Sequence, residues 1–348
     1  SAGTSWAIMD GSDPAYDPAG FIEPELNPRN IDPVTGIIIS ANDWPEAALD
    51  SLGNPLWYPG YYKPQYRADR IRKLLNSSDQ WDLLNMQSVM TDVVNEVDAG
   101  LTKGWKNDLS NHPLMSEKSI RDNFNWDGTY RKDILGPLLF NTMNYELLKM
   151  AMADELGETL FHQFLKTHQM QRCMSVLNVR RQSEWWDDVR TPSKESYEDI
   201  LSKAFEASVR KLREKANENP ENWLWRSTSS KIKQHSNQKH PLGEIGALSF
   251  YNMSCEQDGG NETIRQAGFV PDSLCEFNIY FGSQMRIIAD LKQREYWYNC
   301  TPAGQSGHIM SDYYRNQNEA YLSGKFFKRY KLPLIEKQQM FLVAASNH

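Results

Sequence analysis

The sequence of 348 residues predicts an α+β fold in which a large helical insert separates two sheet-forming segments. Three observations predict it: a β-branched apolar run at 36–40, apolar residues at helical spacing from 66 to 226, and alternation with period two after residue 227. One sandwich with a helical excursion explains the order sheet, helix, sheet more economically than two domains in series. We therefore divide one domain into residues 1–65, 66–226 and 227–348.

Residues 1–65 are expected to form loops around one strand. They are rich in Pro, Gly, Asp and aromatic residues, and the run Gly36–Ser40 is short and β-branched enough to be a buried strand. Asn42 follows the end of this strand, just before a loop that closes at Pro45. Because strand ends are rigid, they are suitable places from which to aim a side-chain amide. Asn42 is therefore a candidate functional residue.

Helical spacing of apolar residues begins at Tyr66. After a cap signal at Ser77–Asp79, this spacing continues through Met86, Met90, Val93 and Val97. The strongest prediction is a helix over 196–216, which begins with the capping-box pair Ser196 and Asp199. One face of this helix is apolar: Tyr197, Ile200, Leu201, Ala204, Phe205, Val209 and Leu212. A second stripe consists of Leu156, Leu160, Phe161, Phe164 and Leu165. Such stripes are usually core, so we assign them no chemistry.

The last segment, 227–348, is expected to return to sheet. Two sets of apolar residues alternate with period two: Phe277, Ile279 and Phe281, and then Met285, Ile287 and Ala289. Each set predicts a strand with one buried face.

Charge and composition exclude several partners and enzyme classes. The chain has 45 acidic and 38 basic residues, a formal net charge of −7, whereas nucleic-acid binding needs a basic surface. No stretch approaches the roughly 18 consecutive apolar residues of a membrane-spanning helix. The motifs of the common nucleotide-binding and zinc-dependent enzymes are also missing from the sequence. We therefore expect neither nucleic acid nor a membrane span.

Metal sites and disulfides receive little support from the sequence. Asp10, Asp13 and Asp17 could hold a hard cation, but their spacing fits no standard calcium loop, and acidic turns are usually just solvated. The aromatic and acidic run Trp185–Asp188 is interpreted as a packed helix end. The four cysteines are too widely spaced for a zinc site, and one disulfide among the last three stays open: Cys173, Cys255, Cys275 and Cys300.

A series of short motifs resembles the penicillin acylase family of N-terminal-nucleophile hydrolases, specifically the C-terminal part of the family's β-chain. No single motif is decisive, but they come in the family's order over nearly the whole chain. They are Asp32-Pro-x-x-Gly36-Ile, Tyr66-Arg67-Ala-Asp-Arg70-Ile, Phe124-Asn-Trp-Asp-Gly128, His240-Pro-Leu-Gly243, Gly259-Gly-Asn-Glu-Thr263, Gly282-Ser-Gln-Met-Arg286 and Gly304-Gln-Ser-Gly307. Two positions depart from the family: Tyr313 stands where it has His, and Asn42-Asp43 replaces its frequent pair of Asn residues.

The resemblance implies an N-terminal-nucleophile αββα sandwich, of which this chain supplies a portion, and the hydrolysis of a linear amide through an acyl-enzyme. In that family the first residue of the β-chain is the nucleophile, and its own α-amine is the base. A backbone N–H and an Asn side chain hold the tetrahedral oxyanion, and this Asn corresponds to Asn42. An Arg at the start of the following helix corresponds to Arg67, which could orient the Asn and lower the pKa of the amine. An ordinary ion pair at a helix start is the alternative for Arg67.

The nucleophile is expected on another polypeptide. Ser1 would supply both a hydroxyl and an amine, but only 41 residues precede Asn42, and the sequence around Ser1 matches a later family segment better than a nucleophile start. We therefore expect one piece of a further-processed or multi-chain enzyme, in which companion chains carry the nucleophile and the pocket for a small acyl-amide substrate. Catalysis would need no cofactor. A structural calcium ion stays open, with Asp50 as a loose candidate ligand.

Two other functions compete with the amide hydrolase. A catalytically inactive scaffold or binding protein of the same fold would not need Asn42. An aromatic-rich carbohydrate-binding protein would explain the 11 Trp and 16 Tyr residues, but not the ordered motifs. Because members of the family are exported, the resemblance also implies a periplasmic or extracellular location.

Overall fold

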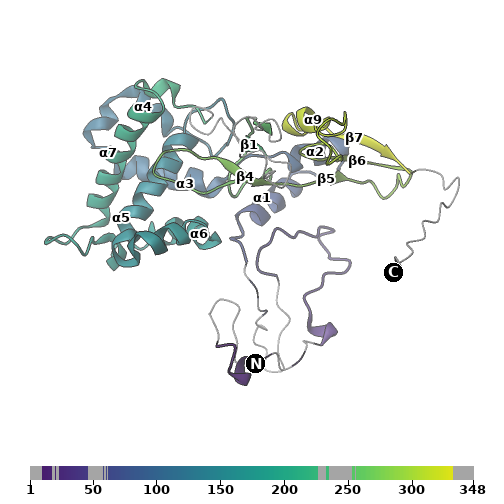
Figure 1. The fold of residues 1–348 in the computed structure, drawn as a ribbon, viewed down its shortest axis with the longest axis horizontal. Coiled ribbons are helices and arrows are strands. Elements are labelled where there is room, and N and C mark those ends of the chain that lie inside the picture. The colour runs from purple at the N-terminus through teal and green to yellow at the C-terminus, as the bar shows by residue number, and fades with distance from the viewer. Residues whose placement is uncertain are drawn as a thin grey trace, which may run out of the picture.

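The computed structural model describes residues 10–17, 20, 23–45, 58, 60, 62–225, 233–234, 253–254 and 256–331. These residues form both helices and small sheets, in agreement with the predicted α+β class (Figure 1). The α-helices are α1 (Tyr66–Leu75), α2 (Leu83–Met90), α3 (Glu96–Asp108), α4 (Lys118–Asn123), α5 (Pro137–Phe164), α6 (His168–Leu177), α7 (Tyr197–Lys215) and α9 (Asn318–Leu322). Short 3-10 helices are η1 (Pro14–Tyr16), η2 (Pro24–Leu26), η3 (Pro113–Ser116), η4 (Glu184–Trp186) and η5 (Pro220–Asn222).

Helices α3 to α7 pack into one compact unit, which we call the helical body (Figure 1). Its centre is the contact between α5 and α7. Large side chains are fully buried there, including Trp105, Leu138, Phe205 and Trp223. Burying apolar area of this size is the main driving force for folding, so the body supplies most of the stability of the described chain.

Helix α7 confirms the strongest sequence prediction. It runs over Tyr197–Lys215, and all seven apolar residues of the predicted stripe are buried. Its start is a true capping box: Ser196 Oγ accepts from the Asp199 backbone N–H at 3.2 Å, and Asp199 Oδ2 accepts from the Ser196 backbone N–H at 3.0 Å. A cap and a stripe are both local signals, which is why the sequence alone locates this helix.

Two other helix predictions need correction. Helix α2 begins one turn later than the signal at Ser77–Asp79, because Asp82 Oδ1 accepts from the Asn85 backbone N–H at 2.8 Å and forms the cap. The stripe from Leu156 to Leu165 is interrupted by Gly157, whose φ of 69° and ψ of 161° kink α5. After this kink the helical phase changes, and Leu160 is 55% exposed instead of buried.

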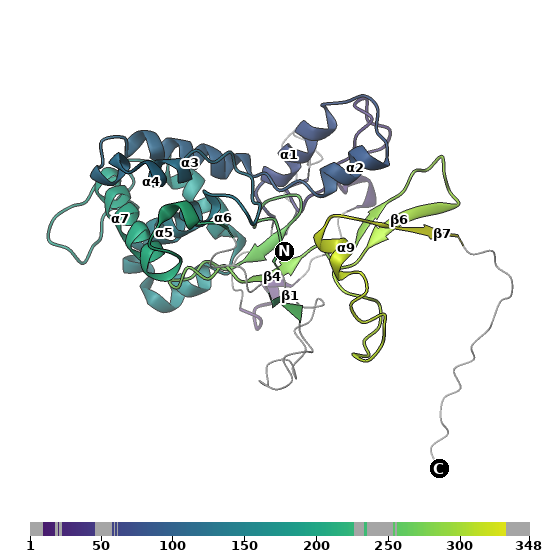
Figure 2. The ribbon, with the colours of Figure 1, turned by 90° about the horizontal axis from the view of Figure 1, so that it is seen from above.

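The strands form small antiparallel sheets: β1 (Lys233–Gln234) pairs with β2 (Met253–Ser254), β3 (Ala267–Phe269) with β4 (Ile279–Gly282), and β5 (Arg286–Ile288) with β6 (Tyr296–Cys300), which in turn pairs with β7 (Phe327–Tyr330). None of these sheets has more than three strands. The described residues alone therefore do not complete the layered sandwich that the family resemblance implies. Figure 2 shows the three-stranded sheet beside α9, at the end of the molecule away from the helical body.

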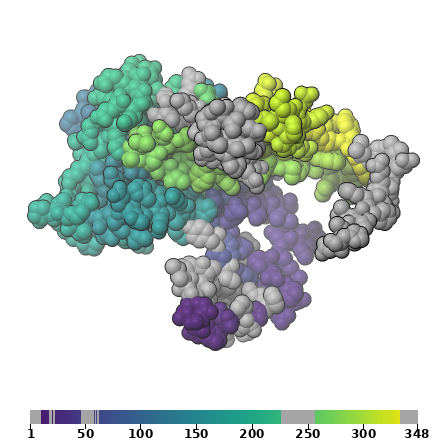
Figure 3. Space-filling model, viewed as in Figure 1, coloured from purple at the N-terminus to yellow at the C-terminus, as the bar shows by residue number. Residues whose placement is uncertain are grey.

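The predicted buried strand Gly36–Ser40 is wrong as stated. Gly36 closes a turn, with a φ of 66° and its N–H donating to the Pro33 carbonyl at 2.8 Å. Residues 37–40 pair with no strand in the described chain and are exposed or half-buried. β-branched residues favour a strand only where a neighbouring strand accepts their backbone hydrogen bonds and covers their side chains. Apart from η2, residues 23–45 contain only turns and irregular backbone. We call them the extended segment because they project from the rest of the molecule, as Figure 3 shows in purple.

The burial phase of β5 is the reverse of the prediction. Arg286 is 2% exposed and Ile288 is 9% exposed, whereas Met285 and Ile287 face outward. The guanidinium of Arg286 lies 3.7 Å from the centre of the Tyr321 ring, and its Nη1 donates to the Tyr321 carbonyl at 2.8 Å. A cation that stacks on an aromatic ring at a helix C-terminus is stabilised there, so a charged residue takes the inner face of the strand.

Candidate functional site

Asn42 lies at the end of the extended segment in an unusual backbone conformation. Its φ is 63°, in the left-handed region that few residues other than Gly adopt, Asn being the most tolerant of them. The Asn42 carbonyl accepts from the Lys63 backbone N–H at 2.8 Å. On the other side, Asp43 Oδ1 accepts from the backbone N–H of the buried Ala41 at 2.9 Å. These hydrogen bonds on both sides fix the turn that carries Asn42.

Arg67, in the first turn of α1, holds the side chain of Asn42. Its Nη2 donates to Asn42 Oδ1 at 2.8 Å and also to the Ala41 carbonyl. Because a guanidinium can only donate, the oxygen of the Asn42 amide must face it. The amide NH₂ group is then directed away from Arg67, on a side chain that is exposed to solvent. The site therefore presents an oriented N–H donor at the molecular surface.

Glu262 is the member of the site that the sequence analysis did not predict. Its Oε2 accepts from Arg67 Nε at 3.4 Å and its Oε1 accepts from Lys63 Nζ at 3.0 Å. The Glu262 side chain is 3% exposed. The only signal was its place in the motif Gly259–Thr263, and 195 residues separate it from Arg67 along the chain.

The motif around Glu262 is a tight loop that depends on glycine. A Cβ atom at Gly259 would lie 2.3 Å from the Arg265 carbonyl oxygen, and its φ is +118°. Within the loop, Thr263 Oγ1 accepts from the Gly260 backbone N–H at 3.0 Å and donates to the Arg265 carbonyl at 2.8 Å. Glycine at 259 permits the close approach, and the threonine hydroxyl fixes the loop that directs Glu262 toward α1.

Burial and charge act on the titratable groups around Arg67. Burial lowers the pKa of Lys63, and the Glu262 carboxylate opposes this change, while the positive charge of Arg67 adds to it. Burial, together with the charges of Lys63 and Arg67, lowers the pKa of His168 at the start of α6, so this imidazole is neutral at pH 7. The neighbourhood of Asn42 therefore holds two cations, the carboxylates of Asp43 and Glu262, and a neutral histidine.

A second carboxyl group lies behind the site, in α3. The pKa of Asp98 is raised to about 7, mainly by burial. The Tyr130 hydroxyl, which donates to Asp98 Oδ2 at 2.7 Å, opposes this change, and the charge of Glu262 adds to it. Tyr66, beside Arg67 in α1, has its pKa raised by burial, while its hydroxyl lies 2.6 Å from Ser175 Oγ. These groups connect the site to the helical body through buried polar contacts.

Other candidate residues from the sequence lie elsewhere. Ser1 and Asp50 fall outside the described residues. Asp10 accepts from Ser12 and Asp13 caps η1, so both carboxylates serve local turns. Among the residues that the structure describes, no group of three or more His, Cys, Asp and Glu side chains could hold a metal ion. In the same part of the chain Cys173, Cys275 and Cys300 are free thiols. None of the described helices combines the length and the apolar character that a membrane span requires.

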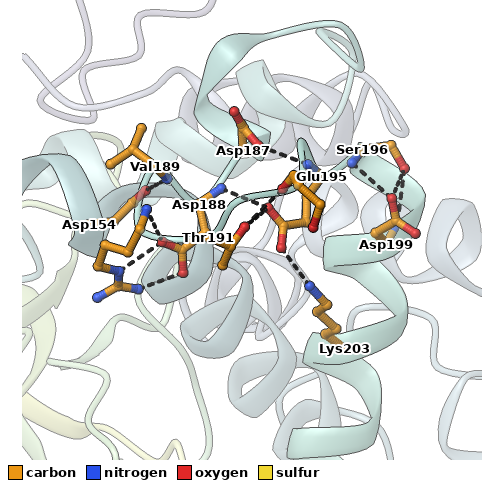
Figure 4. A network of polar contacts seen from close by, with 11 residues as sticks. Asp154, Asp187, Asp188, Val189, Thr191, Glu195, Ser196, Asp199 and Lys203 are labelled. Atoms are coloured by element: carbon orange, nitrogen blue, oxygen red, sulfur yellow. Dashed lines mark hydrogen bonds and ion pairs between the residues drawn. The ribbon is translucent and has the colours of Figure 1, made fainter.

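The run Trp185–Asp188 forms the end of η4, in agreement with the predicted packed helix end. Trp186 is 1% exposed, and Asp188 forms a bidentate pair with Arg190. Asp187 Oδ1 accepts from the Glu195 backbone N–H at 2.8 Å (Figure 4). Figure 4 also shows Glu195 between Thr191 and Lys203, next to the capping box of α7. This polar network fastens a loop to the helical body, and we assign it no chemistry.

An exposed amide donor that is fixed by a guanidinium, beside a second cation, is suited to an oxygen atom that carries or gains negative charge. The arrangement is therefore of the kind that can bind an oxyanion. A family model described as penicillin amidase matches residues 1–331. The chain belongs to the penicillin amidase family.

Curated relatives and a solved structure add to this comparison. The acyl-homoserine lactone acylase QuiP of Pseudomonas syringae pv. tomato is 26% identical over 339 residues, covering 91% of this chain and 39% of the relative. QuiP of Pseudomonas aeruginosa is 25% identical over 346 residues, covering 91% of this chain and 40% of the relative. This chain thus spans about two fifths of these relatives. A thermostable penicillin G acylase from Alcaligenes faecalis aligns over 92% of this chain and 59% of that one, with a TM-score of 0.48 and 13% identity.

Proposed function

We propose that this chain supplies the side-chain amide of Asn42 to the oxyanion hole of an acylase that cleaves a linear amide bond. A nucleophile on a companion polypeptide attacks the amide carbonyl, and the carbonyl oxygen gains negative charge as the tetrahedral intermediate forms. The Asn42 amide then donates a hydrogen bond to that oxygen. Arg67 keeps the amide in the required orientation and adds positive charge nearby.

One observation carries this proposal: Arg67 Nη2 donates to Asn42 Oδ1 at 2.8 Å, which leaves the amide NH₂ for another partner. Membership of the penicillin amidase family supports the reaction type. The relatives named acyl-homoserine lactone acylases support an N-acyl-homoserine lactone, with its linear amide, as the first substrate to test. An amide of the penicillin side-chain type is the second. The reaction as proposed needs no cofactor, and a periplasmic or extracellular location rests on the resemblance to the family.

We also propose that a companion polypeptide covers the extended segment and completes the αββα sandwich. The support is the apolar character of this surface, since Ile31 is 74% exposed, Val34 is fully exposed and Ile38 is 63% exposed. Exposed apolar side chains that lie close together along the chain are well suited to burial against a partner surface.

The test replaces Asn42 in the chain assembled with its companion polypeptide. Asn42→Gly removes the amide and tolerates the left-handed backbone, whereas Asn42→Ala would add backbone strain to the lost donor. We expect kcat toward an N-acyl-homoserine lactone to fall about 10²- to 10³-fold in Asn42→Gly, with KM little changed and assembly unaltered in gel filtration. A wild-type kcat in this variant would show that Asn42 is not part of the oxyanion hole. An assembled wild-type protein that is inert toward both substrates would favour the non-catalytic binding protein.

A further inference from the structure

Glu262 occupies a central position in the site, although it does not touch Asn42. Each of its two oxygens accepts from a different cation, Lys63 at 3.0 Å and Arg67 at 3.4 Å. Both residues contact Asn42 directly: the Lys63 backbone N–H donates to the Asn42 carbonyl, and the Arg67 guanidinium donates to its side chain. One carboxylate therefore connects the two residues that fix the backbone and the side chain of Asn42.

The charges explain why this carboxylate matters. Lys63 is 8% exposed and Arg67 is 11% exposed, so water screens their repulsion poorly. A buried cation is stable only when it is paired, and removal of one partner from a buried ion pair leaves an uncompensated charge. Without Glu262, two like charges would face each other in the space that its carboxylate now fills. Arg67 could then no longer be held in the geometry that orients the Asn42 amide.

We propose that Glu262 is a positioning residue for the reaction, which acts on Asn42 through Arg67 and Lys63. This inference rests on the proposed function, because it assumes that the Asn42 amide stabilises an oxyanion. It assigns a role to the motif Gly259–Thr263: the glycine-dependent loop places one carboxylate against the start of α1.

The pH dependence of the rate distinguishes positioning from simple structural support. The titratable and charged groups around Glu262 and its two cations are Lys63 just before α1, Tyr66 and Arg67 in its first turn, Asp98 in α3 and His168 in α6. Glu262 raises the pKa of Lys63 against the effect of burial. When its charge is removed, Lys63 should lose its proton at lower pH, and the alkaline limb of the kcat profile should move to lower pH.

The experiment is a double-mutant cycle in the assembled enzyme, with an N-acyl-homoserine lactone as substrate. We expect Glu262→Gln to lower kcat by about tenfold or more, to leave KM within about twofold, and to shift the alkaline limb to lower pH. If Glu262 acts through Asn42, the double variant Glu262→Gln with Asn42→Gly should be no slower than Asn42→Gly alone. Glu195→Gln is the matched control, because Glu195 is also a buried carboxylate paired with a lysine, Lys203 at 2.9 Å, but belongs to the helical body. It should leave kcat and the pH profile unchanged.

The outcomes separate this inference from the proposed function. A wild-type kcat and pH profile in Glu262→Gln, or rate losses that add in the double variant, would overturn the positioning role. A wild-type kcat in Asn42→Gly would instead overturn the proposed function. If Glu262→Gln does not assemble, Glu262→Asp replaces it in the cycle, because aspartate keeps the charge but withdraws the carboxylate by one methylene. Additive losses in that cycle would equally contradict the inference.

Discussion

The helical body and the extended segment are two differently stabilised parts of one chain. The body buries large apolar side chains completely, whereas in residues 23–45 only Ala41 is buried. Contacts from Arg67, the Lys63 backbone and the Tyr58 hydroxyl, which donates to the Leu26 carbonyl, hold the extended segment instead. The body is thus built by burial of apolar area, and the site by hydrogen bonds and charge. Substitutions in these two regions should have different consequences.

The largest loss of stability should come from the centre of the helical body. Trp105 is fully buried, stacks on Phe140 with ring centroids 5.3 Å apart, and donates from Nε1 to Asn178 Oδ1 at 3.0 Å. Trp105→Ala should lower the free energy of unfolding by about 3–5 kcal/mol, because it leaves a large cavity and removes the hydrogen bond to Asn178 Oδ1, which then keeps the Tyr197 hydroxyl as its donor. Chemical denaturation followed by circular dichroism measures this change. A loss below about 1 kcal/mol would mean that the body is not the stabilising unit.

An intermediate effect is expected at Asp98, where the body meets the site. Its pKa is about 7 in the folded chain against 3.8 for an ordinary aspartate, so the folded state keeps a proton that the unfolded state has released. The free energy of unfolding should therefore fall as the pH rises from about 4 to 7. Asp98→Asn keeps an oxygen that accepts from the Tyr130 hydroxyl but cannot titrate. The decrease in the free energy of unfolding between pH 4 and 7 should therefore be smaller in this variant by a few kcal/mol. Denaturation curves at several pH values measure it, and identical slopes in both proteins would refute the assignment.

The smallest effect is expected in the extended segment. Ile38 is 63% exposed, so Ile38→Ser should change the free energy of unfolding of this chain by no more than about 0.5 kcal/mol. The matched substitution Ile200→Ser, at a residue 2% exposed in α7, should cost several times more. Both values come from the same denaturation experiment. Equal losses would show that the extended segment has a packed environment of its own, and the contrast between the two regions would disappear.

The sequence predicts local structure better than pairing over long distances. Helix α7 is found to within one residue because its cap and its stripe lie within twenty positions. The strand at Gly36–Ser40 is wrong because a strand needs a neighbouring strand, and the described chain places none beside it. The inner face of β5 is wrong because it depends on Tyr321, 35 residues further along the chain. Asn42 and Arg67 were singled out by resemblance, and they are in contact in the structure, although their catalytic roles remain predictions. Glu262 could not be linked to them because no local pattern connects residues so far apart.

The left-handed backbone of Asn42 also restricts which residues selection can place there. Position 42 requires a residue that tolerates a φ of 63°, and catalysis as proposed requires an amide donor as well. Asparagine meets both requirements. Glycine and aspartate would satisfy the backbone and lose the donor, and glutamine would keep an amide but strain the chain. A related protein that has lost hydrolytic activity could therefore carry glycine or aspartate in place of Asn42 without a change of fold. The residue at this position would then indicate whether a related chain still cleaves amides.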